Sequence, residues 1–112
     1  MDLTCHIREF AGHAVLTLNG EIDVQSAPLL RRYVLDAQHA DHHRLIVDLT
    51  DVSFIDSTGL GLLVGALKRA RAGGGDVTLV AASPAVLKTL SLTGLDKIFP
   101  ITTTLADGFT GT

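Results

Sequence analysis

The side chains best suited to chemistry stand together in Asp56-Ser57-Thr58, between an apolar stretch and a segment rich in leucine and glycine. A hydroxyl can act as a nucleophile or accept a phosphate group, and hydroxyls and carboxylates can both cap a helix. The pattern predicts that a helix begins here, and the first turn of a helix presents N–H groups without partners. Two interpretations remain open: the segment is an ordinary N-terminal cap, or Ser57 is a reactive or modifiable hydroxyl.

Catalysis by Ser57 would require a histidine base and an oxyanion hole. The surrounding residues do not form a G-x-S-x-G motif, and no histidine stands in a motif that links it to Ser57. Cys5 is the only cysteine, so the sequence has neither a Cys-x-x-Cys redox pair nor a cysteine pair that could bind metal. We therefore predict no catalytic residue, and a binding module rather than an enzyme.

Two other segments could suggest a bound ion or nucleotide. His39, His42 and His43 cluster around Asp41, but this stretch resembles the frayed end of a helix, which favours a solvated loop over a metal site. Gly73-Gly74-Gly75 follows a predicted helix, whereas phosphate-binding glycine loops precede one. The sequence therefore predicts no metal and no cofactor.

The helix after Ser57 contains an unusual number of glycines. Its apolar residues recur at steps of three and four, which predicts a buried face of Leu60, Leu63, Val64, Leu67 and Ala70. The remaining positions then fall on the outer side: Gly61, Leu62, Gly65, Ala66 and Arg69. Each glycine costs about 1 kcal/mol relative to alanine in a helix. Such a helix either packs its backbone closely against the sheet or presents a flat docking surface to a partner, and both interpretations remain open here.

Composition limits the class of protein. The chain has 112 residues, which fits one domain spanning 1–112, and its 46% hydrophobic content with few aromatics predicts an aliphatic α/β core. The net charge of −3 argues against a nucleic-acid partner, and Arg31-Arg32 and Lys68-Arg69-Arg71 are expected to mark solvated helix faces. No signal peptide is expected, and no apolar stretch approaches the roughly 20 residues of a membrane span. We expect a soluble, cytoplasmic protein without a membrane partner.

The remaining elements follow from periodicity and turn residues. Strands are predicted at 3–7 with Leu3, Cys5 and Ile7 inward, and at 14–18, 45–49, 77–81 and 97–101; turns are predicted at 11–12 and 19–20. Helices are predicted from Ser26 as N-cap to about 39–40, from Ser57 to Gly73, from Ser83 to Gly94, and from Thr103 or Thr104 through Phe109. This order predicts an α/β fold: a mixed, mostly parallel sheet with an N-terminal β-hairpin, packed against about four helices.

Several of these segments together resemble one known family. They are Gly20-Glu21-Ile22-Asp23, the strand at 45–49, the turn at 56–61 and Thr93-Gly94-Leu95. In this combination the chain resembles the anti-sigma factor antagonists, the single-domain STAS proteins, over nearly its whole length. The Met-Asp-Leu start and the segment Gly65-Ala66-Leu67-Lys68-Arg69 are similar to actinobacterial members.

The resemblance implies a STAS fold and a partner-switching mechanism. In this family the unphosphorylated protein binds an anti-sigma factor that is itself a GHKL-type serine kinase, and so releases a sigma factor. The kinase phosphorylates the serine that matches Ser57, and a PPM-type phosphatase removes the phosphate. Thr58 is a possible second acceptor. The residues expected to bind the partner are Asp23, Asp56, Ser57, Thr58, Gly59, Gly61, Leu62, Gly65 and Arg69.

Two alternatives belong to other functional classes. A STAS module can serve as a docking subunit of another system, such as a transporter or a lipid-transport complex, without regulating a sigma factor. A small nucleotide-binding protein or enzyme is the other alternative, and saturable ATP or GTP binding with hydrolysis would distinguish it.

Overall fold

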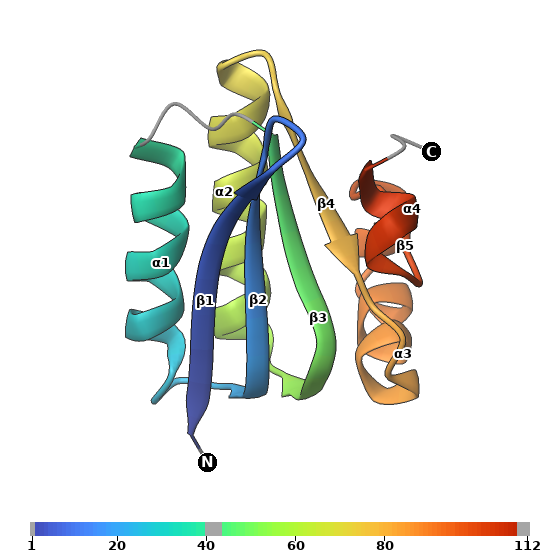
Figure 1. Ribbon diagram of the computed structural model, residues 1–112. Coiled ribbons are helices and arrows are strands. Elements are labelled where there is room, and N and C mark those ends of the chain that lie inside the picture. The colour runs from blue at the N-terminus through green and yellow to red at the C-terminus, as the bar shows by residue number, and fades with distance from the viewer. Residues whose placement is uncertain (1, 40–43, 110–112) are drawn as a thin grey trace.

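The computed structural model describes residues 2–39 and 44–109, and in it five strands form one sheet in the order β1-β2-β3-β4-β5 (Figure 1). β1 and β2 are antiparallel, and each later pair is parallel. The predicted mixed α/β architecture with an N-terminal hairpin is therefore confirmed. In chain order the elements are β1 (Leu3–Phe10), β2 (His13–Ile22), α1 (Ala27–His39), β3 (Arg44–Ile55), α2 (Ser57–Ala72), β4 (Asp76–Val80), α3 (Pro84–Leu92), the 3-10 helix η1 (Leu95–Lys97), β5 (Ile101–Thr102) and α4 (Leu105–Phe109).

The helices divide between the two faces of the sheet. α1 and α2 lie side by side against one face (Figure 1), and they share the main core with α3. That core is aliphatic, as the composition predicts, and includes Leu16, Leu18, Leu30, Val47, Leu63, Leu79 and Leu90, none of which is exposed. On the opposite face, Leu105 and Phe109 at the α4 end pack against a small cluster of Val15, Ile46 and Val80. The N-termini of α1, α2 and α3 consequently point toward the edge where β2, β3 and β4 end.

The second strand is longer than predicted, because the chain does not turn at Asn19-Gly20. β2 continues to Ile22, and its pairing with β3 is irregular between Gly20 and Glu21. Gly20 has φ +125°, and a Cβ there would lie 2.1 Å from the carbonyl oxygen of Asp2. The glycine thus serves a bulge and a close backbone approach, not a turn, so the turn predicted at this point is wrong.

Other boundaries also differ from the sequence-based predictions. Ile7, predicted to face the core, is 38% exposed, since the core covers only the end of the edge strand β1 that contains Leu3 and Cys5. The strand predicted at 97–101 is wrong: Gly94, with φ +74°, leads into η1, and β5 contains Ile101 and Thr102 alone. Of the two candidate caps for α4, Thr104 is the one whose hydroxyl accepts the N–H of Asp107, at 3.3 Å.

Candidate functional site

Four of the predicted site residues, Asp23, Asp56, Ser57 and Thr58, lie at the edge of the sheet where β2 and β3 end, at the lower end of Figure 1, and the others follow along α2. Ile22 and Ile55, the last residues of these parallel strands, are paired, and the N–H of Asp56 donates to the carbonyl of Ile22 at 3.0 Å. Since Asp23 follows β2 and Asp56 follows β3, the strand pairing brings both carboxylates to one place. We call this place the Ser57 edge, made of Asp23, Asp56, Ser57 and Thr58.

Asp56, not Ser57, caps α2. Its backbone is extended, with φ −100° and ψ −177°, and its carboxylate accepts the N–H of Gly59 at 3.1 Å. Ser57 is the first residue of the helix and is exposed, and within the described part of the chain its hydroxyl has no hydrogen-bond partner. The two interpretations of this segment therefore apply to neighbouring residues. Asp56 is the N-terminal cap, and the hydroxyl of Ser57 stays accessible.

Removing the cap should destabilise the protein, whereas removing the Ser57 hydroxyl should not. We expect Asp56→Ala to lower the free energy of unfolding by about 1 kcal/mol, because the N–H of Gly59 loses its partner. Ser57→Ala is the matched control, one residue away in the same turn, and should change stability by less than about 0.5 kcal/mol. Urea unfolding of the three proteins checks this, and equal losses in both variants would mean that Ser57 also caps the helix.

Asp23 holds the loop between β2 and α1 in place. Its carboxylate oxygen Oδ1 accepts the N–H groups of Ser26 and Gln25, each at 2.9 Å. The Ser26 hydroxyl accepts the N–H of Asp23 at 3.0 Å and donates to the carbonyl of Glu21 at 2.8 Å. Ser26 precedes α1 as predicted, but its side chain bonds backward to this loop instead of capping the helix. The side chain of Asp23, a half-buried residue, is thus fixed at the entry to α1, and its neighbour Ile22 is bonded to Asp56 at the start of α2.

The same hydrogen bonds make the charge of Asp23 persistent. The N–H of Ser26 lowers the pKa of Asp23, burial opposes this shift, and the N–H of Gln25 adds to it. A carboxylate whose pKa is lowered by folding stabilises the fold above its unfolded pKa of about 3.9, and this contribution is lost as pH falls through the lowered value. The Ser57 edge therefore remains negatively charged throughout the neutral range.

This linkage predicts a pH-dependent effect of Asp23→Asn, a change that keeps an oxygen for the loop hydrogen bonds but removes the charge. Wild type should be more stable than Asp23→Asn near pH 7, and the difference should shrink as pH falls from the unfolded pKa of about 3.9 through the lowered folded value, below which the wild-type carboxyl is protonated in both states. Urea unfolding of both proteins across this range measures the difference. A stability difference that does not change with pH would show that the ionised form of Asp23 contributes nothing to folding.

The three glycines of α2 have different surroundings. Gly59 is buried, and a Cβ on it would lie 2.4 Å from Cγ2 of Ile22 and 3.0 Å from Cγ1 of Ile55. A Cβ on Gly61 would meet nothing within 4 Å, and one on Gly65 would meet only Nη1 of Arg69, at 3.4 Å. Close packing of α2 against Ile22 and Ile55 explains Gly59, because a larger residue there would push the helix away from the sheet. Gly61 and Gly65 lie on the outer surface.

The prediction for the other outer residues of α2 is right for Arg69 and wrong for Ala66. Ala66 is completely buried and not outward, because it lies one heptad from Gly59 and so shares its face. Val64, predicted as core, and Leu62, predicted as outer, are both half-buried and pack against the core margin. Arg69 is exposed, and its Nε donates to Oε1 of Gln38 in α1 at 2.9 Å.

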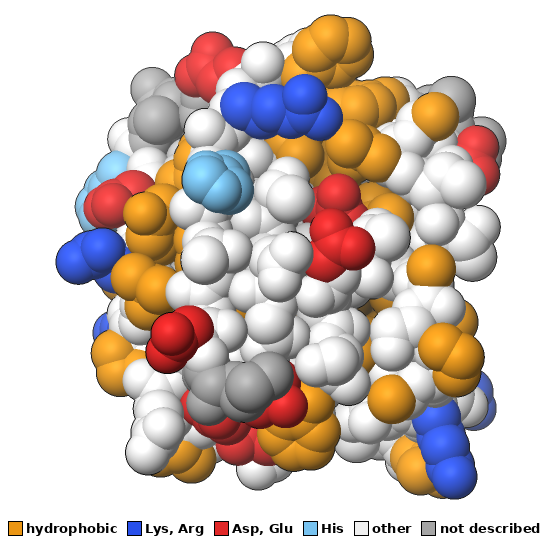
Figure 2. All heavy atoms as spheres, turned by 60° about the horizontal axis from the view of Figure 1, so that its bottom comes forward, with side chains coloured by type: hydrophobic (Ala, Val, Ile, Leu, Met, Phe, Trp, Pro, Cys, Tyr) orange, Lys and Arg blue, Asp and Glu red, His pale blue; other side chains and the backbone are white. Residues whose placement is uncertain are grey.

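Two exposed apolar side chains at this edge were missed by the sequence reasoning. Val24, next to Asp23, is 68% exposed, and Phe54, two residues before Asp56, is 48% exposed. The signal for Phe54 is strand alternation: because Ile55 faces the core, Phe54 must face away. Figure 2 turns this end forward and shows acidic side chains near its lower border, beside a hydrophobic one. An edge of this kind, apolar and acidic with an accessible hydroxyl, suits a protein partner.

Comparison with known proteins assigns the fold. The family model described as the STAS domain matches residues 5–108 of the sequence. The chain belongs to the STAS family. It is 37% identical over 103 residues to an anti-sigma-B factor antagonist of Bacillus subtilis, covering 90% of this chain and 92% of that protein.

Solved STAS structures agree with this assignment. The crystal structure of an anti-sigma factor antagonist from Mycobacterium paratuberculosis has 33% identity and a TM-score of 0.92, covering 98% of this chain and 93% of that one. The anti-sigma factor antagonist SpoIIAA in its unphosphorylated form has 25% identity and a TM-score of 0.76, covering 89% of each chain. The family resemblance and the fold predicted from the motifs are both confirmed.

Other kinds of site find little support in the described residues. Within residues 2–39 and 44–109, no three His, Cys, Asp or Glu side chains are arranged to hold a metal ion. Of the predicted histidine loop, His42 and His43 lie outside the described residues. No helix in the part of the chain that the structure describes is both long and apolar enough to cross a membrane.

Proposed function

We propose that this STAS domain is an anti-sigma factor antagonist that is switched by phosphorylation of Ser57. Unphosphorylated, it binds an anti-sigma factor of the GHKL serine-kinase type and so releases a sigma factor. The observation that carries the proposal is the division of roles at the start of α2. Asp56 caps the helix through Gly59 N–H, which leaves the exposed hydroxyl of Ser57 available to a kinase without loss of the cap.

The fold can accept a phosphate at this position. A phosphoserine carries about −1.5 to −2 charge near pH 7. At the first residue of α2 this charge lies next to the unpaired N–H groups and the positive end of the helix dipole, which favour an anion. Modification should therefore leave the domain folded and change only what its surface can bind.

The same phosphate would alter the binding surface strongly. The partner surface that we propose comprises the Ser57 edge, with Val24 and Phe54, and the outer strip of α2 formed by Gly61, Leu62, Gly65 and Arg69. An acidic or apolar partner group placed close to Ser57 would meet a further strong negative charge beside those of Asp23 and Asp56. Like charges brought together at an interface cost several kcal/mol, which is a hundredfold or more in affinity.

The remaining partners and properties follow from this mechanism. A PPM-type phosphatase would restore the unphosphorylated form, Thr58 would be a second acceptor at most, and the protein itself would catalyse no reaction. Thr58 is exposed, as is Ser57, so access alone does not separate the two hydroxyls. A sigma-factor switch would operate in the cytoplasm, where RNA polymerase is.

Phosphorylation is tested by incubating the pure protein with ATP and each purified GHKL-type kinase of the source organism, followed by intact-mass measurement and site mapping. We expect one added phosphate that disappears in Ser57→Ala and remains in Thr58→Ala. A phosphate lost only in Thr58→Ala would move the switch to that residue. No phosphate with any of the kinases would contradict the proposal and favour a constitutive STAS docking module.

A further inference from the structure

Two pockets between α1 and α2 join to form one groove on the helical side of the molecule. One pocket, of about 210 Å³, is lined by Leu35, Gln38, His39 and Arg69. The other, of about 200 Å³, is lined by Arg31, Leu35, Gly61, Leu62, Gly65 and Arg69. Leu35 and Arg69 line both, so the two pockets adjoin each other. We call the lining residues of both together the α1–α2 groove.

The groove exists because α2 has no side chains where it would otherwise be filled. A Cβ on Gly61 would lie in open space, and one on Gly65 would meet only the guanidinium of Arg69. Glycines that cost helix stability without allowing close packing require another explanation, and access for a second molecule provides one.

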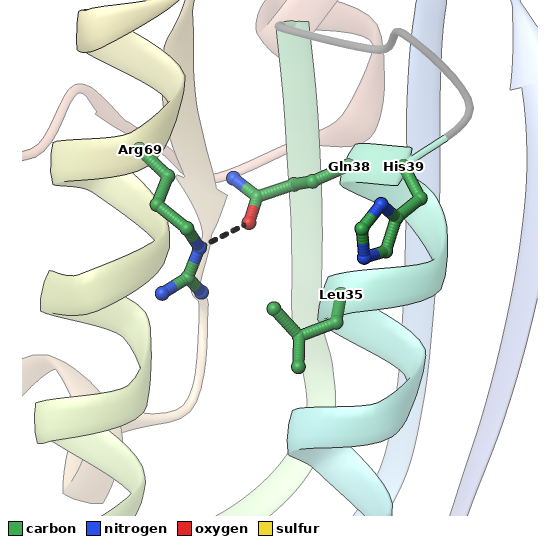
Figure 3. A pocket seen from close by; sticks show the side chains of 4 residues that line it. All are labelled: Leu35, Gln38, His39 and Arg69. Carbon is green, nitrogen blue, oxygen red and sulfur yellow. Dashed lines mark hydrogen bonds between the residues drawn. The ribbon is translucent and has the colours of Figure 1, made fainter.

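Arg69 is held across the groove by a chain of hydrogen bonds. Its Nε donates to Oε1 of Gln38 at 2.9 Å, and Nε2 of the same Gln38 donates to the carbonyl of Ala66 at 2.9 Å. Figure 3 shows Arg69 reaching from α2 toward Gln38 of α1, with Leu35 below them. The Nη groups of Arg69 are left for another acceptor, and a preorganised guanidinium loses less entropy when it binds a carboxylate.

The charge of the groove is of one sign. Its charged lining residues are Arg31 and Arg69, both exposed, and no aspartate or glutamate lines either pocket among the described residues. Between the two arginines lie the half-buried apolar side chains of Leu35 and Leu62. Such a surface complements a segment that carries both carboxylates and an apolar side chain.

We propose that the α1–α2 groove binds an acidic segment of the anti-sigma factor, with carboxylates on Arg31 and Arg69 and an apolar side chain against Leu35 and Leu62. This inference rests on the proposed function and specifies the chemistry of the partner. The groove is continuous with the surface at Ser57, because Gly61 lies four residues along α2 from Ser57, about 6 Å at the rise of a helix. One partner can therefore cover both.

The two ends of this combined surface have opposite charge. Asp23 and Asp56 make the Ser57 edge negative, while Arg31 and Arg69 make the groove positive. A partner that is acidic toward the groove and apolar toward the Ser57 edge, where Val24 and Phe54 are exposed, can dock in one orientation only. The groove then fixes the orientation, and the phosphate at Ser57 acts at the opposite, acidic end.

The test uses the purified GHKL-type kinase domain that binds the wild-type chain most tightly among those of the source organism. Its Kd is measured by titration calorimetry for wild type, Arg31→Glu, Arg69→Glu and the double variant. Lys68→Glu, Lys88→Glu and their double variant change net charge equally on exposed positions outside the groove. Circular dichroism melting of every variant confirms folding, and sedimentation of each protein alone reports self-association.

We expect about tenfold weaker binding for each groove variant and about a hundredfold for the double variant, with less than about threefold for the controls. Replacing one acidic residue of the kinase by lysine should restore part of the affinity of a groove variant. The inference would be overturned if groove and control variants weakened binding equally, or if neither weakened it. The proposed function would survive that result as long as wild type binds the kinase and Ser57→Asp does not. Self-association lost only in the groove variants would overturn it in favour of a second copy of this chain. If no kinase binds wild type, the proposed function fails, and this inference fails with it.

Discussion

Ser57→Asp is expected to weaken binding of the anti-sigma factor about a hundredfold, equivalent to about 2.7 kcal/mol, while changing the free energy of unfolding by less than about 0.5 kcal/mol. The affinity falls because a carboxylate is added to a surface that already carries Asp23 and Asp56 and is covered by the partner. Titration calorimetry gives the affinity, and urea unfolding gives the stability.

The small effect on stability follows from the position of Ser57. The residue is exposed and does not cap α2, so no hydrogen bond of the fold is lost on replacement. A negative charge in the first turn gains from the helix dipole, by about 0.3–1 kcal/mol, and this offsets the repulsion from the neighbouring Asp56. Loss of several kcal/mol of stability would show that Ser57 is mainly a structural residue.

Two matched variants separate charge from other effects. Ser57→Asn has nearly the size of Ser57→Asp but no charge, and it should retain affinity within about fivefold. Ser91→Asp adds the same charge at an exposed position of α3, and it should bind as wild type does. Weak binding by Ser57→Asn would mean that shape, not charge, controls the switch.

Gly59→Ala is expected to destabilise the protein by about 2 kcal/mol, although alanine is the better helix former. The added methyl would lie 2.4 Å from Cγ2 of Ile22, a short branched side chain on the neighbouring strand, so α2 must move away. Overpacking costs about 1–3 kcal/mol, and so close an approach belongs at the upper end, which leaves a net loss of about 2 kcal/mol after the gain of about 1 kcal/mol in helix propensity. Since the shift occurs two residues from Ser57, binding of the anti-sigma factor should weaken as well.

Gly61→Ala is the matched control on the same turn. Its methyl would meet nothing within 4 Å, so the helix propensity of alanine should stabilise the protein by about 0.5–1 kcal/mol. The two single-methyl variants thus have opposite signs, and urea unfolding distinguishes them directly. Equal stability of the two variants would contradict the close approach of Gly59 to Ile22.

The course of the chain to the Ser57 edge could be predicted because strong local signals agree with one another. The run at 45–49 predicts the first half of β3, which continues to Ile55, and the Asp56-Ser57 turn marks the start of α2. Parallel pairing then requires Asp23 and Asp56 to meet. Periodicity alone also placed Leu63 and Leu67 correctly in the core.

Tertiary contacts decide the points that were predicted incorrectly. Asn19-Gly20 is a strong turn signal, and only the carbonyl of Asp2 beside Gly20 shows that the residue serves a bulge. Gly59 and Gly61 are the same residue type two positions apart, and their difference depends on whether Ile22 lies opposite. Ala66 is an exception, because its spacing of three from Leu63 and four from Ala70 indicates the buried face without a structure.

The α1–α2 groove could not be predicted from either helix. Arg31, Leu35 and Arg69 come from separate segments, and single-helix periodicity describes each as a solvated face. The bond of Arg69 to Gln38 depends on how the two helices pack, and so does the space left by Gly61 and Gly65.

The most direct test of the switch is the affinity of the anti-sigma factor for two forms of this one protein, prepared identically except for enzymatic phosphorylation of Ser57. We predict that the unphosphorylated form binds, that the phosphorylated form binds at least about a hundredfold more weakly, and that a phosphatase restores the original affinity. Equal affinity of the two forms would contradict the account, because the phosphate would then lie outside the surface that the partner covers.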